Sequence, residues 1–92
     1  MLEIQFDNKF KKEYKRCLKR GCKPSELETV LKLLASESRL PAKYRDHSLV
    51  DSRNYKGVRE CHINPDWLLI YKIEKDLLII RAIRTGTHSD LF

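Results

Sequence analysis

The sequence predicts an α+β fold in which two N-terminal helices pack on a mainly antiparallel, twisted sheet, with the element order β-α-α-β-β-β. Two observations predict this fold. Apolar residues between positions 10 and 34 recur at helical spacing, whereas those between 58 and 84 fall into three short runs separated by turns. A chain of 92 residues suits one small domain, so we expect residues 1–92 to form a single domain.

The first two elements are a short strand and a helix. Apolar and polar residues alternate over residues 2–6, which is typical of a strand. Gly21 is a natural end for the helix that follows, because glycine adopts the left-handed conformation without steric cost. The apolar stripe that predicts this helix consists of Phe10, Tyr14, Cys17 and Leu18.

The second helix has a predicted start and a predicted end. Residues 25–28 (Ser-Glu-Leu-Glu) fit a capping box, and Pro24 directly precedes them. The helix should end before Leu40, because the residue before a proline is disfavoured in the helical region. Its apolar face, at helical spacing, is formed by Leu27, Val30, Leu31 and Leu34.

Three strands are predicted in the second half of the chain. They are Val58–Ile63, Trp67–Ile73 and Leu77–Arg84, joined by turns at Asn64–Asp66 and Glu74–Asp76. A chain that alternates direction in this way forms an antiparallel meander. The residues after position 84 should therefore lie at the same end of the sheet as the first turn.

Two segments have no clear period. Residues 39–55 form a long stretch of this kind, and such stretches in small domains tend to be functional. Residues 85–87 (Thr-Gly-Thr) are expected to break the last strand and to lead into a mobile tail, residues 88–92.

Charge is distributed unevenly along the chain. The formal net charge is +6, and eight Lys or Arg against three acidic residues give the first 23 residues +5 of it. This asymmetry favours a polyanionic partner, either nucleic acid or a strongly acidic protein. The basic residues are Lys9, Lys11, Lys12, Lys15, Arg16, Lys19, Arg20 and Lys23.

Composition excludes several classes of protein. The apolar runs are too short to span a bilayer, and the N-terminus lacks the basic and apolar regions of a signal peptide, so we expect a cytoplasmic protein. Cys17, Cys22 and Cys61 are odd in number and form no C-x-x-C pair. They therefore predict free thiols in a reducing compartment and neither a disulfide framework nor a zinc knuckle.

The residues suited to chemistry are three histidines and an aspartate. His62, Asp66 and His88 should converge at one end of the meander, and the loop that carries His47 could fold over them. Histidine is the side chain best suited to proton transfer near neutral pH. RNA cleavage needs a base for the 2′-hydroxyl, an acid for the leaving 5′-oxygen and a cation for the phosphorane. The nearby arginines that could supply the cation are Arg59, Arg81 and Arg84.

Other interpretations of these residues stay open at this stage. The histidines and Asp66 could be ligands of zinc or iron, although no HxxxH or HxH spacing supports a metal site. Each histidine could equally be an ordinary surface residue. Trp67, Tyr55 and Phe92 could be core aromatics or could stack on nucleobases.

The C-terminal half resembles a known family. Residues 55–71 (YKGVRECHINPDWLLIY), residues 84–92 (RTGTHSDLF) and the loop segment 44–49 (YRDHSL) closely resemble the YafQ-type toxins of type II toxin–antitoxin systems, a branch of the RelE superfamily. The resemblance covers the whole chain in length and element order and is specific from residue 44 onward.

This resemblance implies a function and a set of roles. The family are ribosome-dependent, metal-independent mRNA endonucleases with a microbial-ribonuclease-like fold, which cut the codon in the A site of the 70S ribosome. A RelB- or DinJ-like antitoxin is then the expected partner of the toxin monomer. The family's functional histidines and aspartate fall on His47, His62, Asp66 and His88, its aromatic residues on Trp67 and Phe92, and Arg59 and Arg84 stand where basic residues would contact the phosphate. We expect His88 to be the acid, Asp66 supported by His62 to be the base, and His47 to position the phosphate. The charge of the first helix leads us to expect ribosome contacts at Lys9, Lys11, Lys12, Lys15, Arg16 and Lys19.

One departure from the wider superfamily matters. Better-known RelE toxins carry a prominent arginine in the strand that here contains residues 68–71 (Leu-Leu-Ile-Tyr), so their mechanism cannot be transferred. Two alternatives to a nuclease remain: a non-catalytic RNA- or ribosome-binding module, and an inactive toxin homologue that acts through protein binding.

Overall fold

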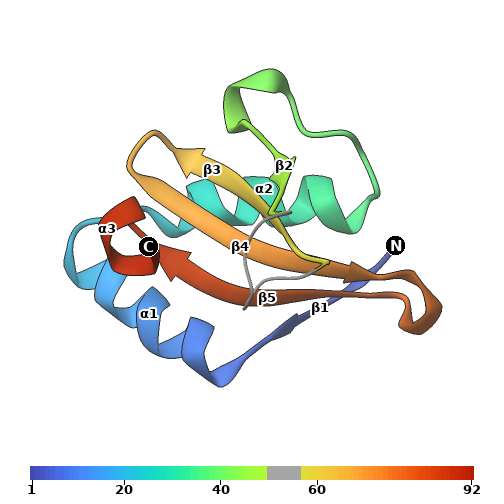
Figure 1. Ribbon diagram of the computed structural model, residues 1–92, viewed down its shortest axis with the longest axis horizontal. Coiled ribbons are helices and arrows are strands. Elements are labelled where there is room, and N and C mark those ends of the chain that lie inside the picture. The colour runs from blue at the N-terminus through green and yellow to red at the C-terminus, as the bar shows by residue number, and fades with distance from the viewer. Residues whose placement is uncertain (50–56) are drawn as a thin grey trace.

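The computed structural model describes residues 1–49 and 57–92, which form a five-stranded sheet with helices against it (Figure 1). The predicted fold class and the predicted order of its main elements are confirmed. In chain order the elements are β1 (Glu3–Phe6), α1 (Asn8–Lys19), α2 (Pro24–Ala35), the 3-10 turn η1 (Ala42–Tyr44), β2 (His47–Ser48), β3 (Arg59–Asn64), β4 (Trp67–Glu74), the 3-10 turn η2 (Lys75–Leu77), β5 (Ile79–Gly86) and α3 (His88–Leu91).

The strands lie in the order β1-β5-β4-β3-β2. All neighbouring pairs are antiparallel except β1 and β5, which run parallel. The central strand β4 is buried on both faces from Trp67 to Tyr71, which explains the uninterrupted apolar run in that part of the sequence. The meander places the β3–β4 turn and the end of β5 at the same end of the sheet, as predicted.

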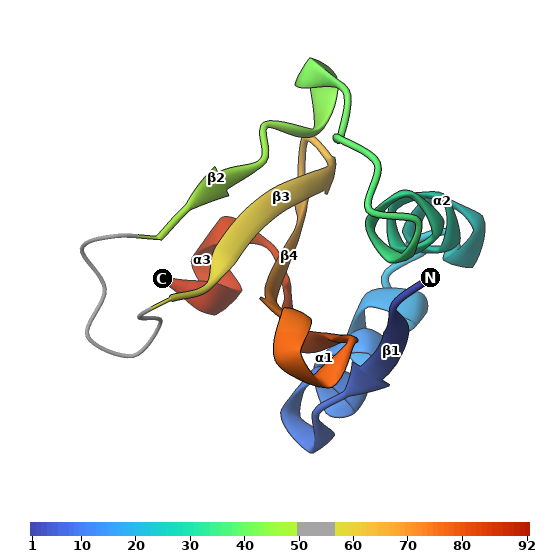
Figure 2. The same cartoon turned by 90° about the vertical axis from the view of Figure 1, so that its right-hand side faces the viewer.

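The two faces of the sheet carry different layers. Helices α1 and α2 cover one face, and α3 lies against the other (Figure 2). The larger core lies under α1 and α2 and includes Phe10, Val30 and Trp67. A smaller cluster on the opposite face contains Val58, Leu68, Ile70 and Leu91. We call that second face, which carries Glu60, His62 and α3, the α3 face.

The two long helices agree with the sequence except at one end. Helix α1 is capped by Arg20, and Gly21 follows it with φ +94°, as expected for a left-handed stop. The predicted capping box at Ser25 is wrong. Helix α2 begins two residues earlier than that box requires, with Pro24 in its first turn and Lys23 at the cap position, and no side chain caps it. Proline suits that position because its φ is already helical and an N–H there has no helical partner.

The last strand is shifted by two residues, and the turn before it by one. The sequence placed the strand at Leu77–Arg84, but Leu77 belongs to η2 and Leu78 adopts a left-handed φ of +56°. Thr85 and Gly86 do not break the strand, because they pair with Leu69 and Leu68 of β4. The strand therefore continues to the base of α3.

Two segments without sequence period contain ordered structure. The first part of the long loop holds η1 and β2, and β2 pairs with β3. Its remainder, residues 50–56, which includes the aromatic Tyr55, lies outside the described residues. The predicted mobile tail is instead the short helix α3, with Thr87 and Asp90 forming a capping box. Among the described helices, none is long and apolar enough to cross a bilayer.

Candidate active site

A buried carboxylate lies between two histidines on the α3 face. Strand β2 pairs with β3 so that His47 is opposite Glu60, and alternation along β3 places Glu60 and His62 on the same side. Glu60 Oε1 is 3.4 Å from His47 Nε2 and 4.0 Å from His62 Nε2. His47 Nδ1 also lies 2.8 Å from the carbonyl oxygen of Arg45, which holds the exposed ring in one orientation.

Glu60 is the residue that sequence reasoning missed. Its side chain is 7% exposed, and within the described chain its Oε2 is a buried oxygen without a hydrogen-bond partner. Buried polar atoms without a hydrogen-bond partner are uncommon in proteins, and a catalytic role is one of the explanations for them. The sequence did contain a signal, because Glu60 precedes His62 by two positions in a predicted strand and therefore shares its face.

His88 and Phe92 stand at the two ends of α3. Both side chains are exposed, and their ring centroids are 5.2 Å apart. Leu91, between them in sequence, is buried against Leu68 and Ile70 and so attaches α3 to the same face that carries His62. The structure therefore places the exposed imidazole of His88 and the exposed ring of Phe92 on the α3 face, which also carries Glu60 and His62.

The strand register sets the spacing between the two histidine positions. His62 pairs with Leu68, and Leu68 pairs with Gly86, two residues before His88. Two strand spacings separate the backbone of His62 from that of Gly86, which amounts to about 10 Å. Asp66 lies on the exposed β3–β4 turn at this end, where its N–H donates to Asn64 Oδ1 at 2.9 Å. The register thus places the β3–β4 turn, the end of β3 and the base of α3 at one end of the sheet, and convergence of the His62, Asp66 and His88 side chains stays a prediction.

Trp67 is a core residue, and the expectation that it stacks on a base is wrong for this structure. Its ring is 1% exposed and stacks against Tyr14 of α1 with ring centroids 6.2 Å apart. The indole Nε1–H donates to Thr85 Oγ1 at 2.7 Å, which satisfies its one donor inside the protein. The sequence shows that Trp67 begins a strand directly after the turn residue Asp66, but it does not show that the ring points toward the helices.

Arg59 does not point at the histidines, contrary to the sequence expectation. Alternation along β3 puts it on the face opposite His62, where its guanidinium pairs with Asp46 at 3.0 Å and donates to Ser48 at 2.8 Å. Tyr71 donates to the same Asp46 carboxylate. The Arg59 charge is thus balanced within a network beside the larger core.

Arg84 and Arg81 are also engaged within the protein. Arg84 Nη2 lies 2.6 Å from Glu13 of α1, and the two side chains are 16% and 8% exposed. Arg81 pairs with Glu74 at 3.2 Å and with Asp7 at 3.4 Å. The prediction that Arg84 meets a phosphate is therefore not supported by its position, because a carboxylate already occupies the guanidinium.

The comparison with protein families decides the assignment. A family model described as "Bacterial toxin of type II toxin-antitoxin system, YafQ" matches residues 2–92. The chain belongs to the YafQ toxin family.

The chain is similar to relatives and solved structures over nearly its whole length. The mRNA interferase toxin YafQ of Escherichia coli (strain B / BL21-DE3) is 42% identical over 91 residues, which is 98% of this chain and 95% of that protein. A metal-bound toxin from Helicobacter pylori has a TM-score of 0.91 and 41% identity, with both chains fully covered. The E. coli DinJ–YafQ complex gives a TM-score of 0.86 and 39% identity, covering 100% of this chain and 99% of that one.

In this YafQ-family chain, the basic residues of α1 form an exposed surface. Phe10, Glu13 and Cys17 face the core, and the basic side chains fill the solvent side of the helix. We call this surface the α1 basic face. Its exposed residues are Lys9, Lys11, Lys12, Lys15, Arg16 and Lys19.

Two of the three cysteines are buried among the described residues. All three thiols are free, as predicted, and burial raises the pKa of Cys17 to about 11 and that of Cys61 to about 12. Thiols in that state are poor nucleophiles, because the thiolate is the reactive form. Within residues 1–49 and 57–92, no group of three or more His, Cys, Asp or Glu is arranged to hold a metal ion.

Proposed function

We propose that this chain, an mRNA interferase toxin of a type II toxin–antitoxin system, cleaves mRNA within the codon that occupies the ribosomal A site. The relatives named mRNA interferase toxins supply the reaction class. The observation that carries the finer proposal is that His47, His62 and α3 with His88 share one exposed face of the sheet. The α3 face therefore carries side chains that can donate a proton, accept a proton and bind an anion, and they come from neighbouring elements of the sheet and from α3.

The reaction is an internal transesterification. The 2′-oxygen attacks the adjacent phosphorus, the bond from phosphorus to the 5′-oxygen breaks, and a 2′,3′-cyclic phosphate remains. His88 protonates the departing 5′-oxygen, since its imidazole is exposed at the start of α3 and histidine is the side chain best suited to proton transfer near neutral pH.

The base lies at the same end of the sheet. Asp66 accepts the proton from the 2′-hydroxyl, and His62 supports it from the neighbouring end of β3. Glu60 lies between the two imidazoles, with its Oε1 4.0 Å from His62 Nε2 and 3.4 Å from His47 Nε2.

Phosphate and base contacts come from groups that remain accessible. His47 is 51% exposed and positions the scissile phosphate. Phe92, which is 54% exposed beside His88, stacks on a codon base, a contact worth about 1–3 kcal/mol. We leave Arg59, Arg84 and Trp67 out of the proposed RNA contacts, because each already has a partner within the protein.

Two macromolecular partners follow. Relatives have been solved as DinJ–YafQ toxin–antitoxin complexes, and this chain binds an antitoxin of that kind. Its net charge of +6 favours an acidic antitoxin segment. The α1 basic face binds ribosomal RNA through sequence-independent phosphate contacts.

Removing charge from the α1 basic face should weaken the salt dependence of ribosome binding. We expect the double variant Lys11→Gln, Lys15→Gln to lower the slope of log affinity against log salt by about 1.4–1.8, since each phosphate contact contributes about 0.7–0.9. The measurement is binding to 70S ribosomes at several salt concentrations. The control, Lys32→Gln with Lys75→Gln, loses the same charge elsewhere on the surface. Equal slopes for both double variants would assign ribosome binding to another surface.

Primer extension on a defined mRNA tests the proposed function. The protein is first treated with EDTA to remove bound metal and is then incubated with that mRNA in ribosome buffer, either with programmed ribosomes or without them. Cuts confined to the A-site codon, and present only with ribosomes, are the expected result. Equal cutting of bare mRNA would retain the nuclease but remove the ribosome as an obligatory partner. Absence of cutting in both tubes by a folded protein would favour the non-catalytic binding module.

A further inference from the structure

Helix α3 is too short to hold its own orientation. It contains four residues, and an isolated helical turn of that length is unstable in water. His88 is its first residue and Phe92 its C-cap, so the direction of α3 fixes where both rings stand. Leu91 provides one attachment through the cluster on the α3 face. A single buried side chain leaves the helix free to rotate about that contact, so another restraint is needed.

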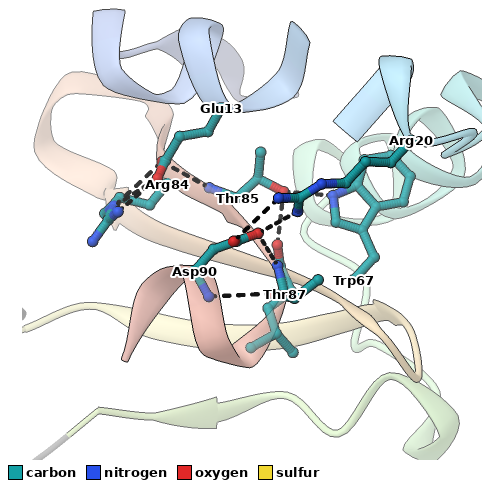
Figure 3. Close-up of polar contacts among 8 residues, drawn as sticks. Glu13, Arg20, Trp67, Arg84, Thr85, Thr87 and Asp90 are labelled. Atoms are coloured by element: carbon teal, nitrogen blue, oxygen red, sulfur yellow. Dashed lines mark hydrogen bonds and ion pairs between the residues drawn. The ribbon is translucent and has the colours of Figure 1, made fainter. Parts of the chain in front are cut away.

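Asp90 provides that restraint, because one carboxylate joins α3 to two other parts of the protein. Its Oδ2 accepts from the backbone N–H of Thr87 at 2.9 Å, while its own N–H donates to Thr87 Oγ1 at 3.2 Å. The same Oδ2 lies 2.6 Å from Nη1 of Arg20, and its Oδ1 is 3.4 Å from Nη2 (Figure 3). Paired contacts of this kind between a guanidinium and a carboxylate fix direction as well as distance.

The partner in this pair comes from the far end of the sequence. Arg20 is the C-cap of α1, 70 residues from Asp90, and its backbone is held by the last turn of that helix. The Arg20 guanidinium and the Thr87 contacts hold the pKa of Asp90 well below its usual range, so the pair remains charged at neutral pH. The proposed chemistry does not use either residue.

The backbone before α3 is shaped to admit this carboxylate. Gly86 has φ +153°, and a Cβ atom there would lie 2.9 Å from Asp90 Oδ2 and 3.0 Å from Asp90 Cβ. Such a separation is shorter than van der Waals contact allows. The close approach of Asp90 to the strand end therefore depends on the absence of a side chain at position 86.

We propose that Arg20 and Asp90 are positioning residues that hold α3 so that His88 meets the leaving 5′-oxygen. This proposal rests on the proposed function of His88. It separates Arg20 from the α1 basic face, although both lie on α1, because the Arg20 side chain is directed to α3 (Figure 3). Misplacing a reacting group by about 1 Å can cost about 100-fold in rate. Loss of the pair therefore acts on turnover and leaves ribosome affinity unchanged.

A double-mutant cycle with a spectroscopic readout tests the proposal. The full-length variants are Arg20→Gln, Asp90→Asn and the double variant, with Ser89→Ala as the control on an exposed position of α3. We expect each single variant to lower kcat for ribosome-bound mRNA about 10- to 100-fold at unchanged KM, and the double variant to be no slower than the slower single one. Melting temperatures should fall by no more than about 8 °C. Ser89→Ala should retain the parent kcat.

The nuclear magnetic resonance signals of the histidine rings decide between the alternatives. In Arg20→Gln, the ring signals of His88 should shift or broaden while those of His47 and His62 stay in place. Unchanged His88 signals, additive losses in the cycle, or a raised KM at constant kcat would each overturn the proposal, the last by placing Arg20 among the ribosome contacts. Failure of the proposed function gives a different result, namely a parent protein that does not cut or a His88→Ala variant that cuts equally fast.

Discussion

A His88→Ala protein is expected to cut the A-site codon about 100- to 10,000-fold more slowly than the parent, because general acid catalysis contributes about that much to a rate. The ring lies exposed at the start of α3, so its removal leaves no cavity and the fold should persist. The measurement is the single-turnover rate at saturating programmed ribosomes, which reports the chemical step independently of binding.

The same assay separates the acid from the base. An Asp66→Asn protein should also lose activity, since the amide cannot accept the proton of the 2′-hydroxyl. If Asp66→Asn cuts normally while His62→Gln does not, the base is His62, whose Nε2 lies 4.0 Å from Glu60 Oε1. Ser89→Ala, next to His88 but exposed, is the control for a non-specific effect of changing α3. A His88→Ala protein with a near-parental rate would remove the acid assignment.

The second large effect concerns stability. Glu13→Ala should lower the free energy of unfolding by about 3–5 kcal/mol, the usual cost of removing one partner from a buried ion pair. Glu13 is 8% exposed, accepts from Arg84 at 2.6 Å and 3.2 Å, and accepts from the N–H of Thr85 at 3.3 Å. Thr85 in turn accepts from the indole of Trp67 and donates to the carbonyl of Leu68. The carboxylate thus joins α1 to the two central strands.

Urea unfolding at neutral pH measures this loss. The midpoint should fall while the slope with denaturant stays constant, since the surface exposed on unfolding does not change. Glu28→Ala is the matched control, because Glu28 is exposed on α2 and its loss should change stability by no more than about 0.5 kcal/mol. A Glu13→Ala midpoint equal to that of Glu28→Ala would show that the pair adds nothing to the stability of the fold.

The sequence predicted correctly those features that depend only on residues near one another in the chain. The helical spacing of Phe10 and Cys17, the stop at Gly21 and the apolar run of β4 are each specified by neighbouring residues, and each is observed. Leu18, the last residue of the predicted apolar stripe, is instead 40% exposed. The end of the sheet that gathers Asp66 and α3 also followed from the sequence, since antiparallel neighbours alternate in direction. The family resemblance, carried mainly by residues after position 44, is confirmed by the matching family model.

What the sequence by itself determined is the fold class, the family and the candidate histidines; what only the tertiary structure decided is which charges are available to a ligand. The sequence alone does not distinguish one arginine from another. In the structure, each of three arginines is paired with a carboxylate distant in sequence: Arg59 with Asp46, Arg84 with Glu13, and Arg20 with Asp90. Local periodicity reports the face on which a side chain lies, but it contains no information about a partner 13 to 71 residues away. Such pairs form only when packing brings distant elements together, and that packing is a property of the whole chain.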